Sequence, residues 1–424
     1  MSVLKKFFKI IHPDDRSKIY FLMFLSLIGM GLETFGVSMI IPLLVMLSKS
    51  SSLPQPVLGF LEKFDVDLNN SEAIIAFLIF MVLFFVIKFL FLLFLVYKQS
   101  LFTYGLQTKL STYMFKGYLL SSYSFHLKHN TTEFIRNVIG EVSQFTSAFL
   151  ALLIFMTEIF VLIGILMLLL FIEPLGALAT LMTLGLSALV YDKFSKKYVK
   201  NWGFIRQENE GVRLKHLNEG LNALKEIKVS GTHKIFTSKF ETNSMKAADM
   251  EVRSIVLSNA PKLGLEFLAV LGVFALILTL INQDKALDEI IPTLAIFGVA
   301  AFRIMPSINR LINTGQVIRY QFAAIDVLER EISNFKKREE KKIYNSLTFD
   351  GIAIENVSFK YPGSKEYILK NINLKIQNKD FIGVVGSSGV GKSTFLNLIL
   401  GLLEPNKGHI KTNKIDILKN IAEW

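Results

Sequence analysis

Long apolar runs alternate with polar, basic segments along most of this chain. Because about 20 mostly apolar residues cross a bilayer as a helix, each run of that length predicts a transmembrane span. Six runs meet this criterion, and the first and third carry an internal glutamate, Glu33 and Glu158. The six are Ile19–Leu47, Ala73–Tyr97, Phe145–Ile172, Leu175–Tyr191, Leu263–Ile281 and Ile290–Ile308.

The connections between these spans differ in their content of lysine and arginine. Residues 98–136 and 192–262 are rich in both, whereas the opposite side has only Lys49, Lys63 and Lys285. Cytosolic connections carry the excess of basic residues in membrane proteins. We therefore predict a multi-pass protein with both termini and both long connections in the cytosol.

The composition agrees with a membrane protein. Of the 424 residues, 51% are hydrophobic, and the net charge is +12. A basic balance can also indicate nucleic-acid binding. Here the basic residues lie mainly in the long connections, so we expect no nucleic-acid partner. The absence of cysteine excludes disulfides and thiolate metal sites.

The two long connections continue the spans before them with mixed polarity. Residues 99–123 and 192–229 show helical periodicity, and each is interrupted, by Ser121-Ser122 and by Ser230-Gly231. This pattern predicts helices that extend far into the cytosol. The alternative, a pair of independent cytosolic domains, is disfavoured because neither connection has a strand pattern.

Residues 1–18 are basic and amphipathic, which favours a short helix on the cytosolic membrane surface over the start of a signal peptide. Pro13-Asp14-Asp15 ends this helix, and an aspartate is available there to cap the next one. Between the first two spans, residues 55–64 suit either a small interfacial helix or a plain loop.

Three cations lie at or near membrane depth: Lys88, Lys262 and Arg303. A charge in lipid is costly and usually faces a partner or a water-filled cavity. We predict that Lys88 and Arg303, with Lys262 at a span edge, line a cationic substrate cavity that suits phosphate or pyrophosphate. Two alternatives stay open. The Lys262 side chain can extend to the membrane–water interface, and Glu33 and Glu158 can neutralise part of the positive charge.

A charged helix and linker, residues 325–346, follow the last span, and a soluble domain occupies residues 347–424. Alternation from Ile352 to Tyr361, with one break, predicts a strand, and residues 367–377 predict a second. Phe381–Val385 reads as a buried strand and Thr394–Leu403 as a helix.

Between these two elements lies a G-x-x-x-x-G-K-[ST] motif, the phosphate-binding P-loop. Its glycines let backbone N–H groups approach phosphate oxygens, and the helix N-terminus favours an anion. Lys392 is predicted to bind the β- and γ-phosphates of ATP, and the Ser393 hydroxyl to bind Mg²⁺. The predicted ATP-binding residues here are Gly386, Ser387, Ser388, Gly389, Val390, Gly391, Lys392, Ser393 and Thr394.

Six spans, long cytosolic helices and a C-terminal P-loop domain resemble the ABC exporters. Val357–Pro362 is similar to the family strand whose aromatic residue, here Tyr361, stacks on adenine, and Gly401–Ile410 is similar to the segment after the P-loop helix. The resemblance implies a helical six-span bundle (residues 19–324) fused to an α/β P-loop domain. It also implies ATP and Mg²⁺ as cofactors and a second half-transporter chain as partner, as a homodimer.

Within the membrane half, Glu33–Val37 with Ile41-Pro42, and Ala301–Arg310, resemble bacterial lipid-linked oligosaccharide flippases. That resemblance implies an anionic polyprenyl-pyrophosphate glycan as substrate, membrane lipids as surroundings, and a bacterial inner-membrane location. Export of peptide, drug or lipid A is the alternative.

The same family also uses a Q-loop, an LSGGQ-type signature, a Walker B acidic pair and a switch histidine, none of which follows the P-loop here. We therefore expect an ATP-binding domain truncated after the adenine-contacting strand and the P-loop, and we assign no catalytic residue. ATP hydrolysis is implied by the family but not expected of the chain as written. An inactive membrane-bound fragment that at most binds nucleotide is the competing interpretation.

Overall fold

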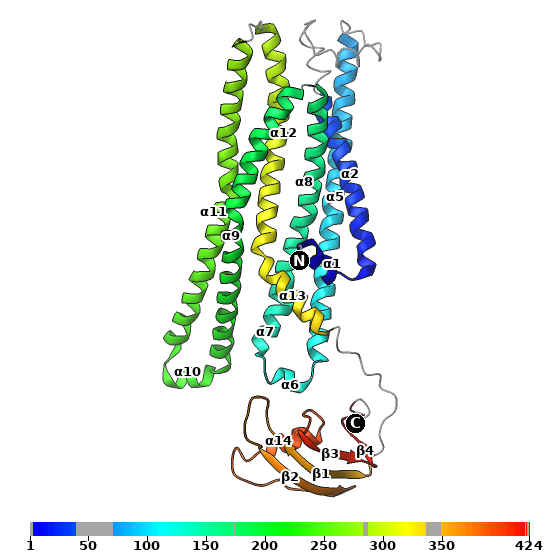
Figure 1. The fold of residues 1–424 in the computed structure, drawn as a ribbon, viewed down its shortest axis with the longest axis vertical. Helices are drawn as coiled ribbons and strands as arrows, with labels where there is room; N and C mark the ends of the chain where they lie inside the picture. Colours follow the sequence, from blue (N-terminus) through cyan, green and yellow to red (C-terminus); the bar gives the residue numbers. More distant parts are fainter. Residues whose placement is uncertain are drawn as a thin grey trace. The chain divides into compact units, whose positions relative to one another are not determined.

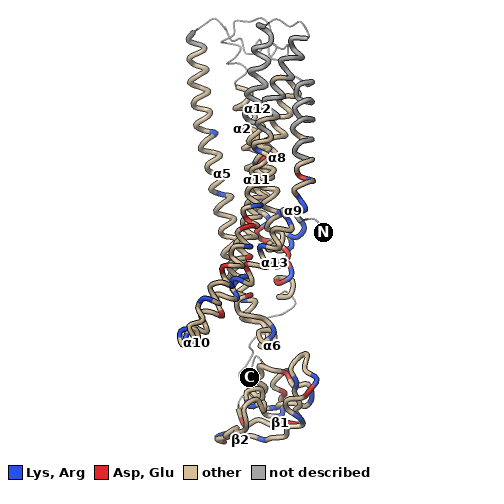
Figure 2. Tube along the Cα trace, turned by 90° about the vertical axis from the view of Figure 1, so that its left-hand side faces the viewer, with Lys and Arg blue, Asp and Glu red and all other residues tan. Residues whose placement is uncertain are grey.

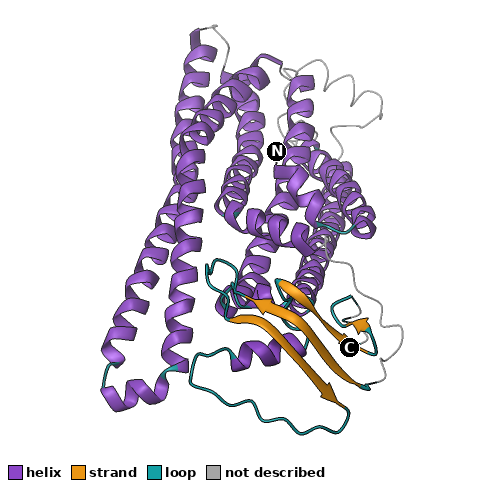
Figure 3. Cartoon of the chain, turned by 60° about the horizontal axis from the view of Figure 1, so that its bottom comes forward, coloured by secondary structure: helices purple, strands orange, loops and turns teal. Residues whose placement is uncertain are grey.

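The computed structural model describes residues 3–39, 71–172, 174–282, 287–335, 349–419, 421 and 424. The chain divides into two compact units, which are described separately below. One contains Met1–Met114 and Ile135–Glu331, and the other contains Phe115–Phe134 and Ile332–Trp424. Long helices make up the first unit, and the strands all belong to the second (Figures 1 and 3).

Six long helices account for most of the described chain, and in the first unit they run side by side (Figure 1). Three described stretches are long and apolar enough to cross a membrane by themselves: Pro13–Ser38, Ile74–Leu119 and Thr131–Phe171. The long helices are α2 (Arg16–Ser38), α5 (Ser71–Leu119), α8 (Val142–Ile172), α9 (Pro174–Asn222), α11 (His233–Asn282) and α12 (Leu287–Tyr320).

The predicted helical extensions are present, since α5, α9 and α11 each continue well beyond their apolar parts. The predicted interruptions are present too. Helix α5 ends before Ser121, and α10 (Leu224–Ser230) joins α9 to α11. Gly231 adopts a left-handed conformation, φ 69°, at the end of α10, which explains a glycine at this break.

Polar side chains link three of the helices inside the apolar bundle. The Ser26 hydroxyl of α2 lies 2.9 Å from the Thr157 hydroxyl of α8, and the Gln99 amide of α5 donates to the same Thr157 oxygen at 3.2 Å. Hydrogen bonds between hydroxyl and amide side chains hold helices together where no water competes. The links fix how α2, α5 and α8 lie against one another.

The N-terminal segment is helical as predicted, but its apolar side does not face lipid. Helix α1 (Val3–Ile10) inserts Phe7, only 1% exposed, against the rings of Phe145 and Phe149 of α8, at 5.2 and 5.8 Å. A helix packed in this way buries its aromatic face against protein. The bundle therefore covers the surface that we expected to rest on the membrane.

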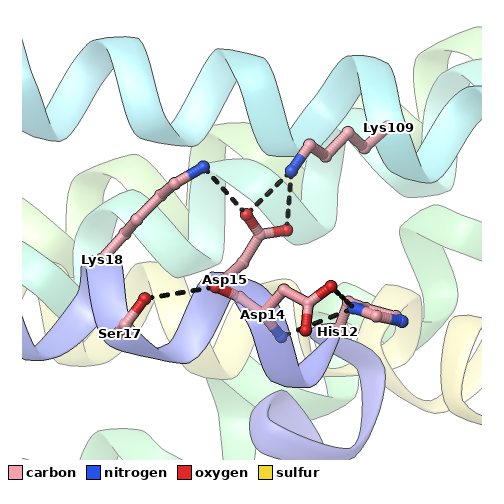
Figure 4. Close-up of polar contacts among 6 residues, drawn as sticks. All are labelled: His12, Asp14, Asp15, Ser17, Lys18 and Lys109. Atoms are coloured by element: carbon pink, nitrogen blue, oxygen red, sulfur yellow. Dashed lines mark hydrogen bonds and ion pairs between the residues drawn. The ribbon is translucent and has the colours of Figure 1, made fainter.

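The expected aspartate cap is replaced by an ion pair. Asp15 ends the short turn η1 (Pro13–Asp15), and its side chain makes no capping hydrogen bond. Instead it accepts hydrogen bonds from Lys109 of α5 at 2.8 and 2.9 Å and from Lys18 at 3.3 Å (Figure 4). Leaving a buried carboxylate without a cationic partner costs more free energy than leaving a helix N-terminus without a side-chain cap.

Helix α1 is also joined by charge to α13 (Phe322–Phe335), the helix after α12. Lys6 contacts Asp326 and lies 3.3 Å from Glu329, and Lys9 donates to Glu329 at 2.9 Å. Together with the Phe7 contacts, these pairs fix the N-terminal helix between α8 and α13.

Three short helical segments precede α8 in the chain. They are α6 (Tyr123–His126), α7 (Thr131–Ile135) and the π-helical turn η2 (Arg136–Glu141). A π-turn widens the helix locally and shifts the side chains that follow it. Residues 55–64, which we assigned to an interfacial helix or a loop, lie outside the described residues.

The sheet of the second unit is antiparallel, in the order β2-β1-β3-β4. The pairing of β1 with β2 is irregular between Ile354 and Val357, at the break seen in the alternation of the sequence. Leu398 of α14 and Ile410 of β3 are fully buried and pack with Ile354 of β1 in one apolar core. The elements are β1 (Gly351–Phe359), β2 (Leu369–Gln377), α14 (Lys392–Ile399), β3 (Lys407–Thr412) and β4 (Ile415–Asp416).

The prediction of a buried strand at Phe381–Val385 was wrong. These residues form no strand, and Val385 is 91% exposed. A strand before a P-loop is stable only between hydrogen-bonded neighbours. Within the described residues the sheet places no strand beside it.

The ion pairs of α1 and α13 predict a pH-dependent contribution to stability. The hydrogen bond from Lys9, with a second from Lys6, holds the pKa of Glu329 below its ordinary value of 4.5. A lowered carboxyl pKa adds stability that is complete above pH 4.5 and is lost as the pH falls through the folded-state pKa. We expect Glu329→Gln to lower the melting temperature near neutral pH, and this difference to shrink below pH 4.5.

The measurement is thermal unfolding of the detergent-solubilised chain over a pH series. Glu208→Gln, on an exposed position of α9, is the matched control and is expected to change little at any pH. A Glu329→Gln difference that stays constant down to acid pH would contradict the ion-pair explanation.

Candidate nucleotide and substrate sites

The P-loop forms an open turn that leads into α14. Gly389 and Gly391 have φ values of 83° and 104°, a left-handed region that favours glycine. A Cβ on Gly391 would lie 2.7 Å from Ile368, so no larger residue fits there without a shift. The motif glycines are therefore needed to shape the turn.

Lys392 begins α14 and folds back over the turn. Its ammonium donates to the carbonyl oxygens of Gly386 and Ser387 at 2.9 and 2.8 Å. Ser393 is exposed beside it, in the first turn of the helix. A helix N-terminus with an ammonium and a hydroxyl next to it is a suitable place for a phosphate. The residues present thus fit the triphosphate of a nucleotide.

Tyr361, the predicted adenine-contacting residue, lies close to the same helix. Its hydroxyl is 3.2 Å from the hydroxyl of Thr394, and its ring packs edge-on against Phe359, with centroids 5.1 Å apart. The fold therefore brings Tyr361 to the P-loop helix. Its contact with adenine stays a prediction.

Lys88 has an acidic partner inside the bundle. Its ammonium lies 2.7 Å from the carboxylate of Glu33 on α2, and the two side chains are 13% and 7% exposed. It also lies 4.9 Å from the ring centre of Phe85. The positive charge that we predicted for a substrate cavity is therefore matched by a negative charge at the same position.

The described side chains include only one of the other two cavity candidates. Lys262 is exposed on α11, next to Pro261, and the side chain of Arg303 lies outside the described residues. Glu158 of α8 pairs with Arg310 of α12 at 2.6 Å. Glu33 and Glu158 thus each bind a cation from another helix.

Sequence reasoning missed a buried polar cluster where α9 meets α12. Arg206 is nearly inaccessible, donates to Glu210 and to Gln321, both at 3.1 Å, and lies over the Tyr320 ring. Arg206 and Glu210 are four residues apart, a spacing that predicts an ion pair on one face of a helix. Gln321 is distant in sequence and could not be found that way.

Charged residues of the helical unit are concentrated toward the end that carries α10 (Figure 2). The apolar part of α5 shows few charges in the same view. Such a division is typical of helices that cross a membrane and continue into water on the basic side.

The chain belongs to the family of the ABC transporter transmembrane region, whose model matches residues 21–300, well over half of its length. Residues 369–424 match a second ABC transporter model, that of the ATPase region, which implies ATP binding. The chain is therefore a multi-pass ABC exporter polypeptide with a helical transmembrane region followed by a partial ATPase domain.

Curated relatives of different stated function match at similar identity. An ATP-dependent lipid A-core flippase of Wigglesworthia glossinidia brevipalpis is 25% identical over 54% of this chain, and the nisin transport ATP-binding protein NisT of Lactococcus lactis is 26% identical over 52%. The multidrug resistance-like ATP-binding protein MdlA of Buchnera aphidicola is 24% identical over 90%. The matches span 38%, 37% and 67% of these relatives, respectively.

Among solved structures, a bacterial Atm1-family ABC exporter with ATP bound matches with a TM-score of 0.72. The match covers 96% of this chain and 70% of that one, at 14% identity, and it shows the fold alone. Homologues of this kind are half-transporters, which typically dimerise.

The Glu33–Lys88 contact predicts a specific pattern of stability. Removing one partner takes away the opposite charge that compensates the other within the bundle, at a cost of roughly 3–5 kcal/mol, whereas replacing both with apolar residues is often nearly neutral. We expect Glu33→Leu and Lys88→Met each to lower the melting temperature of the solubilised chain. The double variant should recover most of the loss.

The double variant is the internal control, because it removes the same side chains without leaving a single charge. If it melts as low as the worse single variant, the two residues do not act as a pair. Lys88 would then return as a candidate for the substrate cavity.

Proposed function

We propose that this chain is an ATP-driven ABC half-transporter. The observation that carries the proposal is the P-loop at Gly386–Thr394, which has an open turn and begins a helix in the same polypeptide as six long helices. ATP binding would supply the free energy, and the helical region would provide alternating access across the membrane.

In this proposal, Lys392 and the backbone N–H groups of Gly386–Thr394 bind the nucleotide phosphates. Ser393 binds Mg²⁺, and Tyr361 stacks on adenine. Two donors of the Lys392 ammonium bind loop carbonyls, and the third would bind a phosphate oxygen. Bound Mg²⁺ would neutralise phosphate charge.

For the substrate, we propose an amphipathic lipid with an anionic head group, and specifically a lipid-linked oligosaccharide. The resemblance of Glu33–Val37 and Ala301–Arg310 to lipid-linked oligosaccharide flippases supports it. The lipid A-core flippases among the relatives support the broader lipid class. Lipid A, peptide and drug remain the competing cargoes, since NisT and MdlA match equally well.

We further propose a homodimer in the bacterial inner membrane with both termini in the cytosol. The basic residues of the long connections support that orientation. The proposed divisions are residues 1–18 for the N-terminal helix, 19–324 for the transmembrane domain, 325–346 for the linker and 347–424 for the ATP-binding part.

Nucleotide binding is tested with Lys392→Ala. A hydrogen bond to a charged group contributes roughly 1.5–3 kcal/mol, so its loss should weaken ATP binding about 10- to 150-fold. Equilibrium dialysis with radiolabelled ATP on the purified chain gives the dissociation constants. Lys370→Ala, an exposed lysine of β2, is the matched control and should bind like the wild type. If both variants lose the same ATP affinity, or if neither loses any, the assignment of Lys392 is contradicted.

The cargo is tested in liposomes with a full-length version of the protein. We expect ATP-dependent movement of a fluorescent polyprenyl-pyrophosphate glycan between leaflets, and its loss in Lys392→Ala. Lipid A, a lantibiotic-type peptide and a cationic dye are assayed in parallel. Movement of one of these without movement of the glycan would reject the oligosaccharide proposal while leaving the exporter proposal in place.

A further inference from the structure

A groove of about 330 Å³ lies between α2 and α5, near the start of α2. Its floor is apolar and includes Leu22, Phe102 and Leu106. Three lysines line it as well: Lys18 of α2, and Lys98 and Lys109 of α5. An apolar floor beside several cations is an amphipathic site.

The groove lies where the apolar parts of the two helices end. On α2 the apolar run begins at Ile19, directly after Lys18, and on α5 it ends at Tyr97, directly before Lys98. Both helices are long and apolar enough to cross a membrane. Basic residues at such a boundary face the head-group region of the bilayer. The groove therefore opens at the level of lipid head groups, on the basic side.

Asp15 holds two of the lysines in place without cancelling the charge of the site. Lys109 donates two hydrogen bonds to the Asp15 carboxylate and Lys18 donates one, as Figure 4 shows. The side chains of Lys18 and Lys109 are still 60% and 59% exposed. An ammonium group has three donors, so both retain the capacity to bind a further anion. Three lysines and one aspartate leave an excess of two positive charges among the groove residues.

We propose that this groove is a binding site for an anionic phospholipid of the membrane, distinct from the transport cargo. The phosphate group binds Lys18, Lys98 and the outer side of Lys109, and an acyl chain lies on the apolar floor. Positive charge, apolar lining and position at the membrane boundary each favour this ligand over a soluble anion. A zwitterionic lipid lacks the net charge that the lysines complement.

Gly105 provides a way to close the groove without changing its charge. It is an exposed lining residue of α5, and a Cβ placed there meets no atom within 4 Å. A larger side chain is therefore accommodated by the folded helix. Gly105→Leu fills the space that an acyl chain would occupy, and leucine is also a better helix former than glycine.

The experiment is native mass spectrometry of the full chain released from a mild detergent. The probes are phosphatidylglycerol, phosphatidylcholine and inorganic phosphate, titrated separately. We expect the wild type to retain phosphatidylglycerol at least about 5-fold better than phosphatidylcholine, and inorganic phosphate not to compete. Lys18→Gln/Lys98→Gln should abolish this preference, and Gly105→Leu should reduce binding of both lipids.

The lysine variant keeps the Asp15–Lys109 pair and therefore the buried carboxylate remains compensated. Lys193→Gln/Lys196→Gln, two exposed positions on α9, removes the same charge away from the groove and should bind like the wild type. Equal lipid preference in wild type and Lys18→Gln/Lys98→Gln would overturn the proposal. Competition by inorganic phosphate would also overturn it. Retention of lipid on monomers but not on dimers would overturn it as well, because the groove would then be an interface between two copies of the chain.

Discussion

A charge inside a helical bundle must be compensated by a partner, because lipid and packed side chains cannot solvate it. Glu33 with Lys88, Glu158 with Arg310 and Asp15 with Lys109 all satisfy this requirement between helices. Each pair therefore fixes the register of two helices as well as neutralising two charges. A sliding movement of one helix along another by a single turn would separate the partners.

The bundle combines these pairs with continuous helices. Helix α5 has 49 residues and α11 has 50, lengths of roughly 75 Å at about 1.5 Å per residue. Rods of this length carry a displacement at one end to the other. The left-handed Gly231, the π-turn η2 and Pro261 within α11 interrupt the regular helical hydrogen bonding, and bending is easier at these places than within α5.

The sequence was sufficient to predict the helices, because their signal is local. Apolar length located the spans, mixed polarity located their extensions, and Ser230-Gly231 located a break. The partners of charges could not be predicted in the same way. The sequence indicated that Glu33 could neutralise part of a cationic cavity, but not that it pairs with Lys88. It gave no indication that Gln321 accepts a hydrogen bond from Arg206. Both contacts depend on tertiary packing. The apolar run Phe381–Val385 was misassigned for a related reason, since a strand requires neighbours that periodicity does not reveal.

The Lys392 ammonium is held in place by its own loop. Two of its three donors bind the carbonyl oxygens of Gly386 and Ser387, and the third is left for an anion. A long lysine side chain ordinarily loses rotamer freedom when it binds a ligand. Here the loop has already restricted that freedom, so the ordering cost of capturing a phosphate is reduced.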